Sequence, residues 1–223
     1  MWREAIQQVL ISEARLQRRI RALGQAISVD YQGKDLVLVA ILKGALMFSA
    51  DLARAVELPL TMDWLALSSY GPSHRSSGRV NLLQDLSESI AGKHVLIIED
   101  IVDTGTTLEY LWNHLMRRQP ADLNVCTLLE KRAHRRVELP IKYSGFEVPD
   151  AFVVGYGLDY QQRFRNLPFI GILSPEVLAS GGSRAQAARR PAPGQGHGSP
   201  GRGNAVSRDI GSRNPASCKG RAP

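Results

Sequence analysis

The stretch Val95-Leu96-Ile97-Ile98-Glu99-Asp100-Ile101-Val102-Asp103-Thr104-Gly105-Thr106-Thr107-Leu108 decides the fold class of this chain. The apolar residues 95–98 predict a strand that is buried on both faces, and two adjacent carboxylates follow it. A third carboxylate then precedes a loop of hydroxyl side chains, which leads into a helix predicted over residues 107–118. Ligands of an open parallel sheet bind beyond the carboxyl ends of its strands. The stretch therefore predicts an α/β fold and also the position of its site.

Other apolar runs and helical patterns alternate along the first 176 residues. Residues 36–42 (LVLVAIL) form a continuous apolar run, which is typical of a strand covered on both faces. Further strands are predicted over residues 61–67, 80–86, 123–129, 151–155 and 168–173. Helices are predicted over residues 44–56 and 2–23, the second broken near Ser12 and stopped by Gly24. Strands interleaved with helices predict a mostly parallel central sheet flanked by helices.

Composition divides the chain into a domain and a tail. From Ser180 to the end there are nine glycines and five prolines in 44 residues, with almost no large apolar side chains. Such a segment buries too little surface to offset its ordering entropy. We therefore predict one domain over residues 1–176 and a disordered Gly/Pro/Arg-rich tail over residues 177–223.

Charge and cysteine content exclude several classes of function. From Glu176 onward, eight basic and two acidic residues carry +6 of the net charge of +7, so residues 1–175 are nearly neutral. This disfavours nucleic acid as a partner. No apolar run approaches the roughly 20 residues of a membrane-spanning helix, and the N-terminus lacks the pattern of a secretion signal. With Cys126 and Cys218 as its only cysteines, we expect a cytoplasmic chain without disulfides or membrane contact.

The acids and the hydroxyl loop suit a sugar phosphate. Glu99 and Asp100 can grip separate ribose hydroxyls, and their mutual repulsion favours a bound cation such as Mg²⁺. Residues 104–107 offer hydroxyls, a glycine and helix N-terminal amides, which suit a 5′-phosphate. Asp103 lies between the two groups and could take a proton from an attacking base. A strand–turn–helix with ordinary Asp and Thr caps is the simpler alternative, which the full combination disfavours.

The motif EDIVDTG resembles that of the phosphoribosyltransferase family, and within it the 6-oxopurine branch. The resemblance implies a type I phosphoribosyltransferase fold, in which a small hood covers the central sheet. It implies transfer of 5-phosphoribosyl from phosphoribosyl pyrophosphate to a 6-oxopurine base, hypoxanthine or guanine, with Mg²⁺ as cofactor and pyrophosphate as leaving group. Family members are homodimers or homotetramers. In this family Glu99 and Asp100 match acids at the ribose and metal, and Asp103 matches the base near purine N7.

Further segments match the family in the same order along the chain. Taken alone, each has a simpler explanation as a surface lysine, a solvent loop, a core strand or a surface ion pair. The resemblance also implies an unusual peptide bond before the lysine of the pyrophosphate loop. The matched residues are Lys43 and Gly44 for pyrophosphate, Ser69 and Tyr70 for a mobile flap, Thr104, Gly105, Thr106 and Thr107 for the 5′-phosphate, Lys131, Phe152 and Val153 for the base, Asp159 for Mg²⁺, and Arg165 for pyrophosphate.

Two alternatives remain beside this interpretation. A regulator could keep the sugar-phosphate site and bind nucleic acid, but it would need a basic face that the neutral domain lacks. An enzyme for adenine or orotate is disfavoured by Lys131, since a lysine donates to a purine O6 but not to an amino group. Two departures from the family are the added tail and Thr106, where some relatives carry lysine.

Overall fold

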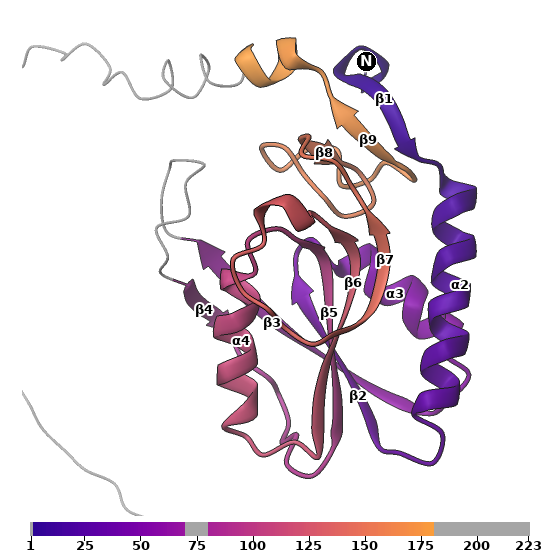
Figure 1. The fold of residues 1–223 in the computed structure, drawn as a ribbon, viewed down its shortest axis with the longest axis vertical. Helices are drawn as coiled ribbons and strands as arrows, with labels where there is room; N and C mark the ends of the chain where they lie inside the picture. Colours follow the sequence, from indigo (N-terminus) through magenta and orange to yellow (C-terminus); the bar gives the residue numbers. More distant parts are fainter. Residues whose placement is uncertain (1, 70–79, 181–223) are drawn as a thin grey trace, which may run out of the picture.

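The computed structural model describes residues 2–69 and 80–180, which form two sheets of unequal size (Figure 1). The larger sheet has the order β4-β3-β2-β5-β6-β7, and all of its neighbours are parallel except β3 and β4. The predicted mostly parallel sheet is thus confirmed. Its strands are β2 (Leu36–Leu42), β3 (Leu60–Ser69), β4 (Val80–Gln84), β5 (His94–Val102), β6 (Asp122–Glu130) and β7 (Ile141–Glu147).

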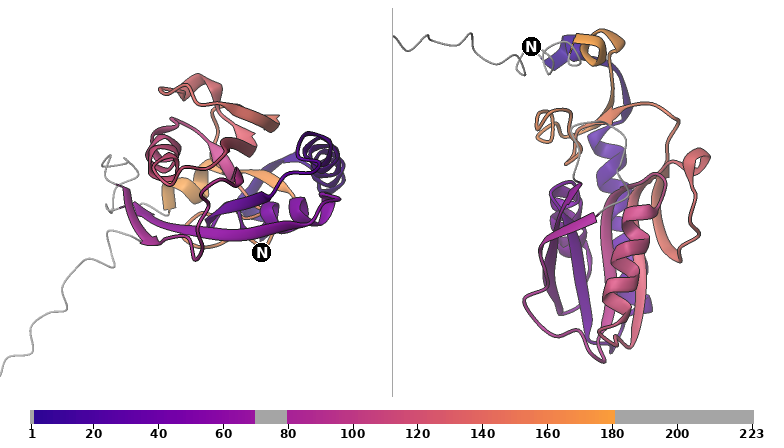
Figure 2. Two further views of the ribbon diagram at one scale, coloured as in Figure 1. Left: turned by 90° about the horizontal axis from the view of Figure 1, so that it is seen from below. Right: turned by 90° about the vertical axis from the view of Figure 1, so that its left-hand side faces the viewer.

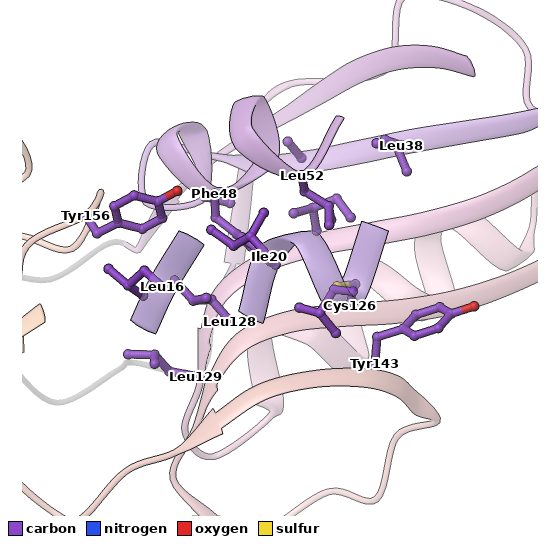
Figure 3. Packing of buried hydrophobic residues seen from close by; sticks show 14 of the residues in the cluster. Leu16, Ile20, Leu38, Phe48, Leu52, Cys126, Leu128, Leu129, Tyr143 and Tyr156 are labelled. Atoms are coloured by element: carbon purple, nitrogen blue, oxygen red, sulfur yellow. The ribbon is translucent and has the colours of Figure 1, made fainter. Parts of the chain in front are cut away.

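Helices cover both faces of the larger sheet (Figure 2). Helices α2 (Glu13–Asp30) and α3 (Leu46–Ala55) pack on one face, and α4 (Thr106–Met116) packs on the other. Side chains along β2 alternate between the two resulting cores, with Leu38 in the first and Val39 in the second. Figure 3 shows the first core, where Phe48 and Leu52 of α3 meet residues of α2 and the sheet. The apolar run of β2 is continuous because both of its faces are covered.

The smaller sheet is a hood over the ends of the larger one, and its strands come from the two ends of the domain (Figure 1). Its antiparallel order is β1-β9-β8, with β1 (Ile6–Ile11), β8 (Val153–Val154) and β9 (Ile170–Leu173). The helix predicted over residues 2–23 is therefore wrong for residues 6–11. Only α1 (Trp2–Ala5) and α2 are helical there, and Ser12 caps α2 at the predicted break. The strand forms because β9, far away in sequence, supplies its partner.

Two further differences have a packing origin. Gly24 does not end α2, which continues to Asp30. A Cβ at Gly24 would lie 2.3 Å from the carbonyl oxygen of Ala55, so this glycine allows α2 and α3 to approach closely. Strand β7 was not predicted from the sequence, and it extends the sheet beside β6. Its Gly145 lies against the backbone of Leu128, where a Cβ would come within 2.3 Å of the carbonyl oxygen.

Asp51 of α3 ties the hood segment to the helical layer. Its Oδ2 accepts hydrogen bonds from the Tyr156 hydroxyl and, at 2.9 Å, from Nε2 of Gln17 on α2. Burial and this carboxylate raise the pKa of Tyr156 above its usual range. Tyr156 belongs to the segment that follows β8, so one carboxylate joins α2, α3 and the hood.

The described chain ends in a short helical segment, residues 175–180. Val177 and Leu178 of this segment pack against the core of the hood. Most of the predicted tail lies outside the described residues. Within the described ranges, every helix is too short or too polar to cross a bilayer.

Candidate active site

Gly44 lies at the centre of the site because it brings three segments together. The preceding peptide bond, Leu42–Lys43, is cis, as the resemblance implied for this loop, and Lys43 is exposed. A Cβ at Gly44 would lie 1.7 Å from Oδ2 of Asp100. A Cβ at Gly157 would lie 2.0 Å from the carbonyl oxygen of Gly44. The loop after β2, the acids of β5 and the loop after β8 thus meet without intervening side chains.

The two adjacent acids lie inside β5 rather than after it, because that strand continues to Val102. The Asp100 amide donates to Oε1 of Glu99 at 3.2 Å, and the Ile101 amide donates to Oδ1 of Asp100 at 2.8 Å. Burial raises the pKa of Glu99 well above its usual value, and the negative charge of Asp100 adds to this effect. A bound cation would therefore stabilise the ionised form of Glu99 and Asp100 by neutralising their negative charge.

Asp159 and Arg165 form an ion pair in the loop after β8. Their closest nitrogen–oxygen distance is 2.6 Å, and a second guanidinium nitrogen of Arg165 donates to the carbonyl oxygen of Gly157 at 2.6 Å. The backbone N–H of Gln162 donates to the other Asp159 oxygen at 2.8 Å. Since Gly157 packs on Gly44, this pair is anchored next to the loop that carries Lys43.

The hydroxyl loop has the geometry of a helix start. Gly105 caps α4 with a φ of 85°, a left-handed conformation that glycine adopts without strain. The hydroxyls of Thr104 and Thr106 are 3.0 Å apart, and Thr106 and Thr107 are exposed at the first turn. Exposed hydroxyls and amides at a helix N-terminus suit an anion.

Asp103 contacts a histidine that the sequence analysis did not assign. Its Oδ1 is 3.1 Å from Nδ1 of His134, and Nε2 of His134 is 3.2 Å from Oδ2 of Asp150. The other oxygen of Asp150 is 3.8 Å from Nζ of Lys131, whose side chain is largely buried. The structure thus links the two predicted residues Asp103 and Lys131 through two others.

The two residues predicted to place the base have different surroundings. Phe152 is partly exposed, and its ring meets that of Tyr160 edge to face, with centroids 5.4 Å apart. The side chain of Val153 is buried in the first core. Because β8 is an edge strand of the hood, Val153 has one backbone edge that does not pair within that sheet. A contact of Val153 with a base would therefore come from its backbone.

The predicted flap falls only partly within the described residues. Ser69 is the last residue of β3, and Tyr70 lies outside the described ranges.

The residues present fit a magnesium ion that shares its ligands with a substrate. Glu99 and Asp100 are hard oxygen donors, and burial together with the charge of Asp100 raises the pKa of Glu99, so a cation would favour the ionised pair. In the described ranges, no three His, Cys, Asp or Glu side chains gather into a group that could hold a metal alone. A magnesium ion here would complete its shell with water and phosphate oxygens, as it commonly does.

Several residues of the site were missed or left without a role by the sequence analysis. His134 belongs to a basic run that is typical of a solvated loop, and Asp150 is a single acid in a turn. Gly157 lies inside a matched motif, but its packing on Gly44 depends on the tertiary structure. Cys126, by contrast, is buried as expected of a small apolar residue, and burial raises the pKa of its thiol.

Comparison with known proteins shows the class of this chain. A family model described as the phosphoribosyl transferase domain matches residues 6–161. The hypoxanthine-guanine phosphoribosyltransferase of Bacillus subtilis (strain 168) is 46% identical over 180 residues, which are 81% of this chain and 100% of that protein. A crystal structure of a hypoxanthine phosphoribosyltransferase from Staphylococcus aureus has a TM-score of 0.76 at 45% identity, covering 78% of this chain and 95% of that one.

A third similarity is to part of a longer protein. The bifunctional protein TilS/HprT of Listeria monocytogenes serotype 4b (strain F2365) is 49% identical over 174 residues, which are 78% of this chain. The chain spans only 27% of that protein's length.

The matching family model spans the whole larger sheet together with β1 and β8 of the hood, so the chain is a phosphoribosyltransferase by class. Its likeness to the Bacillus enzyme extends over that enzyme's full length. The chain therefore belongs to the hypoxanthine-guanine phosphoribosyltransferase family.

Proposed function

We propose that this chain transfers 5-phosphoribosyl from phosphoribosyl pyrophosphate to hypoxanthine and guanine, giving IMP or GMP and pyrophosphate. In this reaction a bond forms between N9 of the base and the anomeric carbon of the ribose. The bond from that carbon to a pyrophosphate oxygen breaks, and the base loses its N7 proton. The convergence of Gly44, Asp100 and Gly157 carries the proposal, because it joins the segments for pyrophosphate, ribose and metal at one point.

The donor is held by the ends of the strands. Glu99 and Asp100 bind the ribose hydroxyls, and residues 104–107 bind the 5′-phosphate at the start of α4. The leaving pyrophosphate lies against Lys43 and Arg165, with Asp159 beside its metal. When bound, Mg²⁺ neutralises the acids and the pyrophosphate as negative charge develops on the leaving group. Asp159 and Arg165 already contact each other, so they can hold the metal and the pyrophosphate from two sides.

The acceptor is held by the loops around the hood. Lys131 donates to O6 of the base, Phe152 stacks on its ring, and Val153 offers backbone groups to its edge. Asp103 then accepts the N7 proton. The flap that begins at Ser69 and includes Tyr70 excludes water while the transfer occurs.

We also propose that the enzyme is cytoplasmic and assembles into a homodimer or homotetramer. Leu46 and Met47 of α3 are large apolar residues on the surface, which supports association with a second copy. Light scattering in solution would measure the assembly.

The decisive experiment is an assay of the whole chain with hypoxanthine, phosphoribosyl pyrophosphate and Mg²⁺. Asp103→Asn should retain substrate binding and lose about 10²- to 10⁴-fold in turnover, the usual contribution of a general base. Asp35→Asn is the matched control, since it changes an exposed aspartate before β2, at the other end of the sheet. Absence of any nucleotide product from the unaltered chain would refute the activity. Near-normal turnover of Asp103→Asn would refute only the role of Asp103.

A further inference from the structure

Four side chains from three loops form a continuous polar chain on the acceptor side of the site. In order they are Lys131, Asp150, His134 and Asp103, and the successive contacts are 3.8, 3.2 and 3.1 Å. Lys131 and Asp103 already have proposed roles at O6 and N7, which are neighbouring atoms on one edge of a 6-oxopurine. His134 and Asp150 connect the residues that would read those two atoms.

Backbone contacts hold His134 in place between the two carboxylates. His134 ends a short 3₁₀ turn, Arg132–His134, which directly follows Lys131. The Lys131 amide donates to the carbonyl oxygen of Val102 at 2.9 Å, and the Arg136 amide donates to that of Thr104 at 3.0 Å. The turn is therefore fastened on both sides to the segment that carries Asp103.

The chemistry of the imidazole defines what this contact can do. Its two ring nitrogens face one carboxylate each, and an ionised carboxylate can only accept a hydrogen bond. The contact with Asp103 has hydrogen-bond geometry and needs a proton on Nδ1, whereas the contact with Asp150 is an ion pair that needs a second proton on the ring. Four other charged residues around the turn pair with one another, and they are Arg132, Arg135, Glu130 and Glu147.

We propose that His134 is a positioning residue, which orients the Asp103 carboxylate for proton transfer at N7. Asp103 is about half exposed, with 48% of its side-chain surface accessible, so its carboxylate would otherwise rotate in solvent. The contact with His134 engages Oδ1 and thereby fixes the direction of the second oxygen. This inference rests on the proposed transfer to a purine, and it adds a residue that acts through Asp103.

The test compares His134→Ala, His134→Gln and the control Arg132→Ala. The control lies in the same turn and contacts neither Asp103 nor Asp150. His134→Ala should lower kcat for IMP formation about 10-fold, because a misplaced reacting group is costly, with KM for phosphoribosyl pyrophosphate unchanged. His134→Gln keeps a donor and should recover part of the rate.

A double variant shows whether His134 acts through Asp103. In an Asp103→Asn background, His134→Ala should cost nothing further, because the group that it positions is already removed. An additional 10-fold loss there would overturn the inference, as would an equal loss from Arg132→Ala. Wild-type kcat in His134→Ala would also overturn it, while product formation by the unaltered chain would leave the proposed function intact. His134 has 43% of its side-chain surface exposed, so thermal melting of all variants should stay close to wild type.

Discussion

We assign one side of the site to the donor and the other side to the acceptor. The two sides differ in the kind of contact that holds them together. On the donor side, Gly44, Asp100 and Gly157 approach so closely that a Cβ at either glycine would clash. On the acceptor side, Asp103, His134 and Asp150 are exposed side chains that reach across between loops. Backbone packing fixes Gly44 and Gly157 on the donor side, whereas the acceptor side is held by contacts between side chains. A fixed donor site combined with an adjustable acceptor site suits an enzyme with one donor and two related bases.

Among the further changes that compare the two sides, the largest effect is expected at the fixed side, from Gly44→Ala. The new Cβ would lie 1.7 Å from Oδ2 of Asp100, so that carboxylate must swing away. Displacing it by about 1 Å should lower kcat/KM about 10²-fold. The melting temperature should change little, because the atom that moves is the end of a side chain. Gly33→Ala is the control for kinetics, since nothing lies within 4 Å of a Cβ there, and it should keep wild-type kinetics although its φ of 74° makes an alanine there less stable.

The acceptor side should respond differently, as Lys131→Met would reveal. Removing one charged hydrogen bond to O6 should raise KM for hypoxanthine about 10- to 100-fold. KM for phosphoribosyl pyrophosphate should stay within twofold, because the donor is held by other loops. Lys34→Met, a change of an exposed lysine before β2, supplies the comparison. Equal changes in both KM values would mean that the two sides are not separate.

A smaller effect, on stability, should come from Glu99→Gln on the donor side. Burial and the charge of Asp100 raise the pKa of Glu99 from its usual 4.5, so the folded chain resists ionising this carboxyl. Its contribution to stability is therefore complete below about pH 4.5 and is lost as the pH rises through the raised pKa. At pH 8, without Mg²⁺ or donor, Glu99→Gln should raise the melting temperature by about 2–4 °C, which corresponds to about 1 kcal/mol.

The pH dependence of that gain distinguishes it from a general packing effect. The gain should vanish near pH 4, where Glu99 is protonated in both the folded and the unfolded chain. A gain of the same size at every pH would contradict the electrostatic explanation. Turnover should fall in the same variant, since a neutral amide removes the charge proposed to face the metal.

The smallest effect is expected from deleting residues 180–223. No residue that we assign to either side of the site belongs to this segment, and its composition predicts no core. Kinetics and melting temperature should both remain almost unchanged, as measured by the transfer assay and by thermal unfolding. A large loss of activity or of melting temperature would mean that the segment has a role that its composition does not indicate.

Local sequence patterns were sufficient for five of the six strands of the central sheet, all except β7. The run over residues 36–42 predicted a strand covered on both faces, and the structure has β2 at the same bounds. Hydroxyls and a glycine after the acids predicted the start of α4, which begins at Thr106. These elements depend only on residues that are close together in the chain, so they can be predicted from a single sequence.

The features that were predicted wrongly or missed share a cause. Each of them depends on a contact with residues that are distant in sequence. Residues 6–11 were predicted helical because the strand β9 that pairs with them lies more than 150 residues away. Gly24 resembled a helix stop, and only the approach of α3 explains a glycine inside α2. His134 resembled part of a solvated basic loop, and only the fold places it between Asp103 and Asp150.

The sequence by itself determined the parallel sheet, the adjacent acids on β5 and the family to which they belong, because these are written in consecutive residues. The tertiary structure alone decided how Gly44 meets Asp100 and Gly157, and how His134 joins the two carboxylates beside it. Such contacts join loops that follow different strands. Their geometry arises only when strands that are far apart in sequence become neighbours and their carboxyl ends meet at one edge.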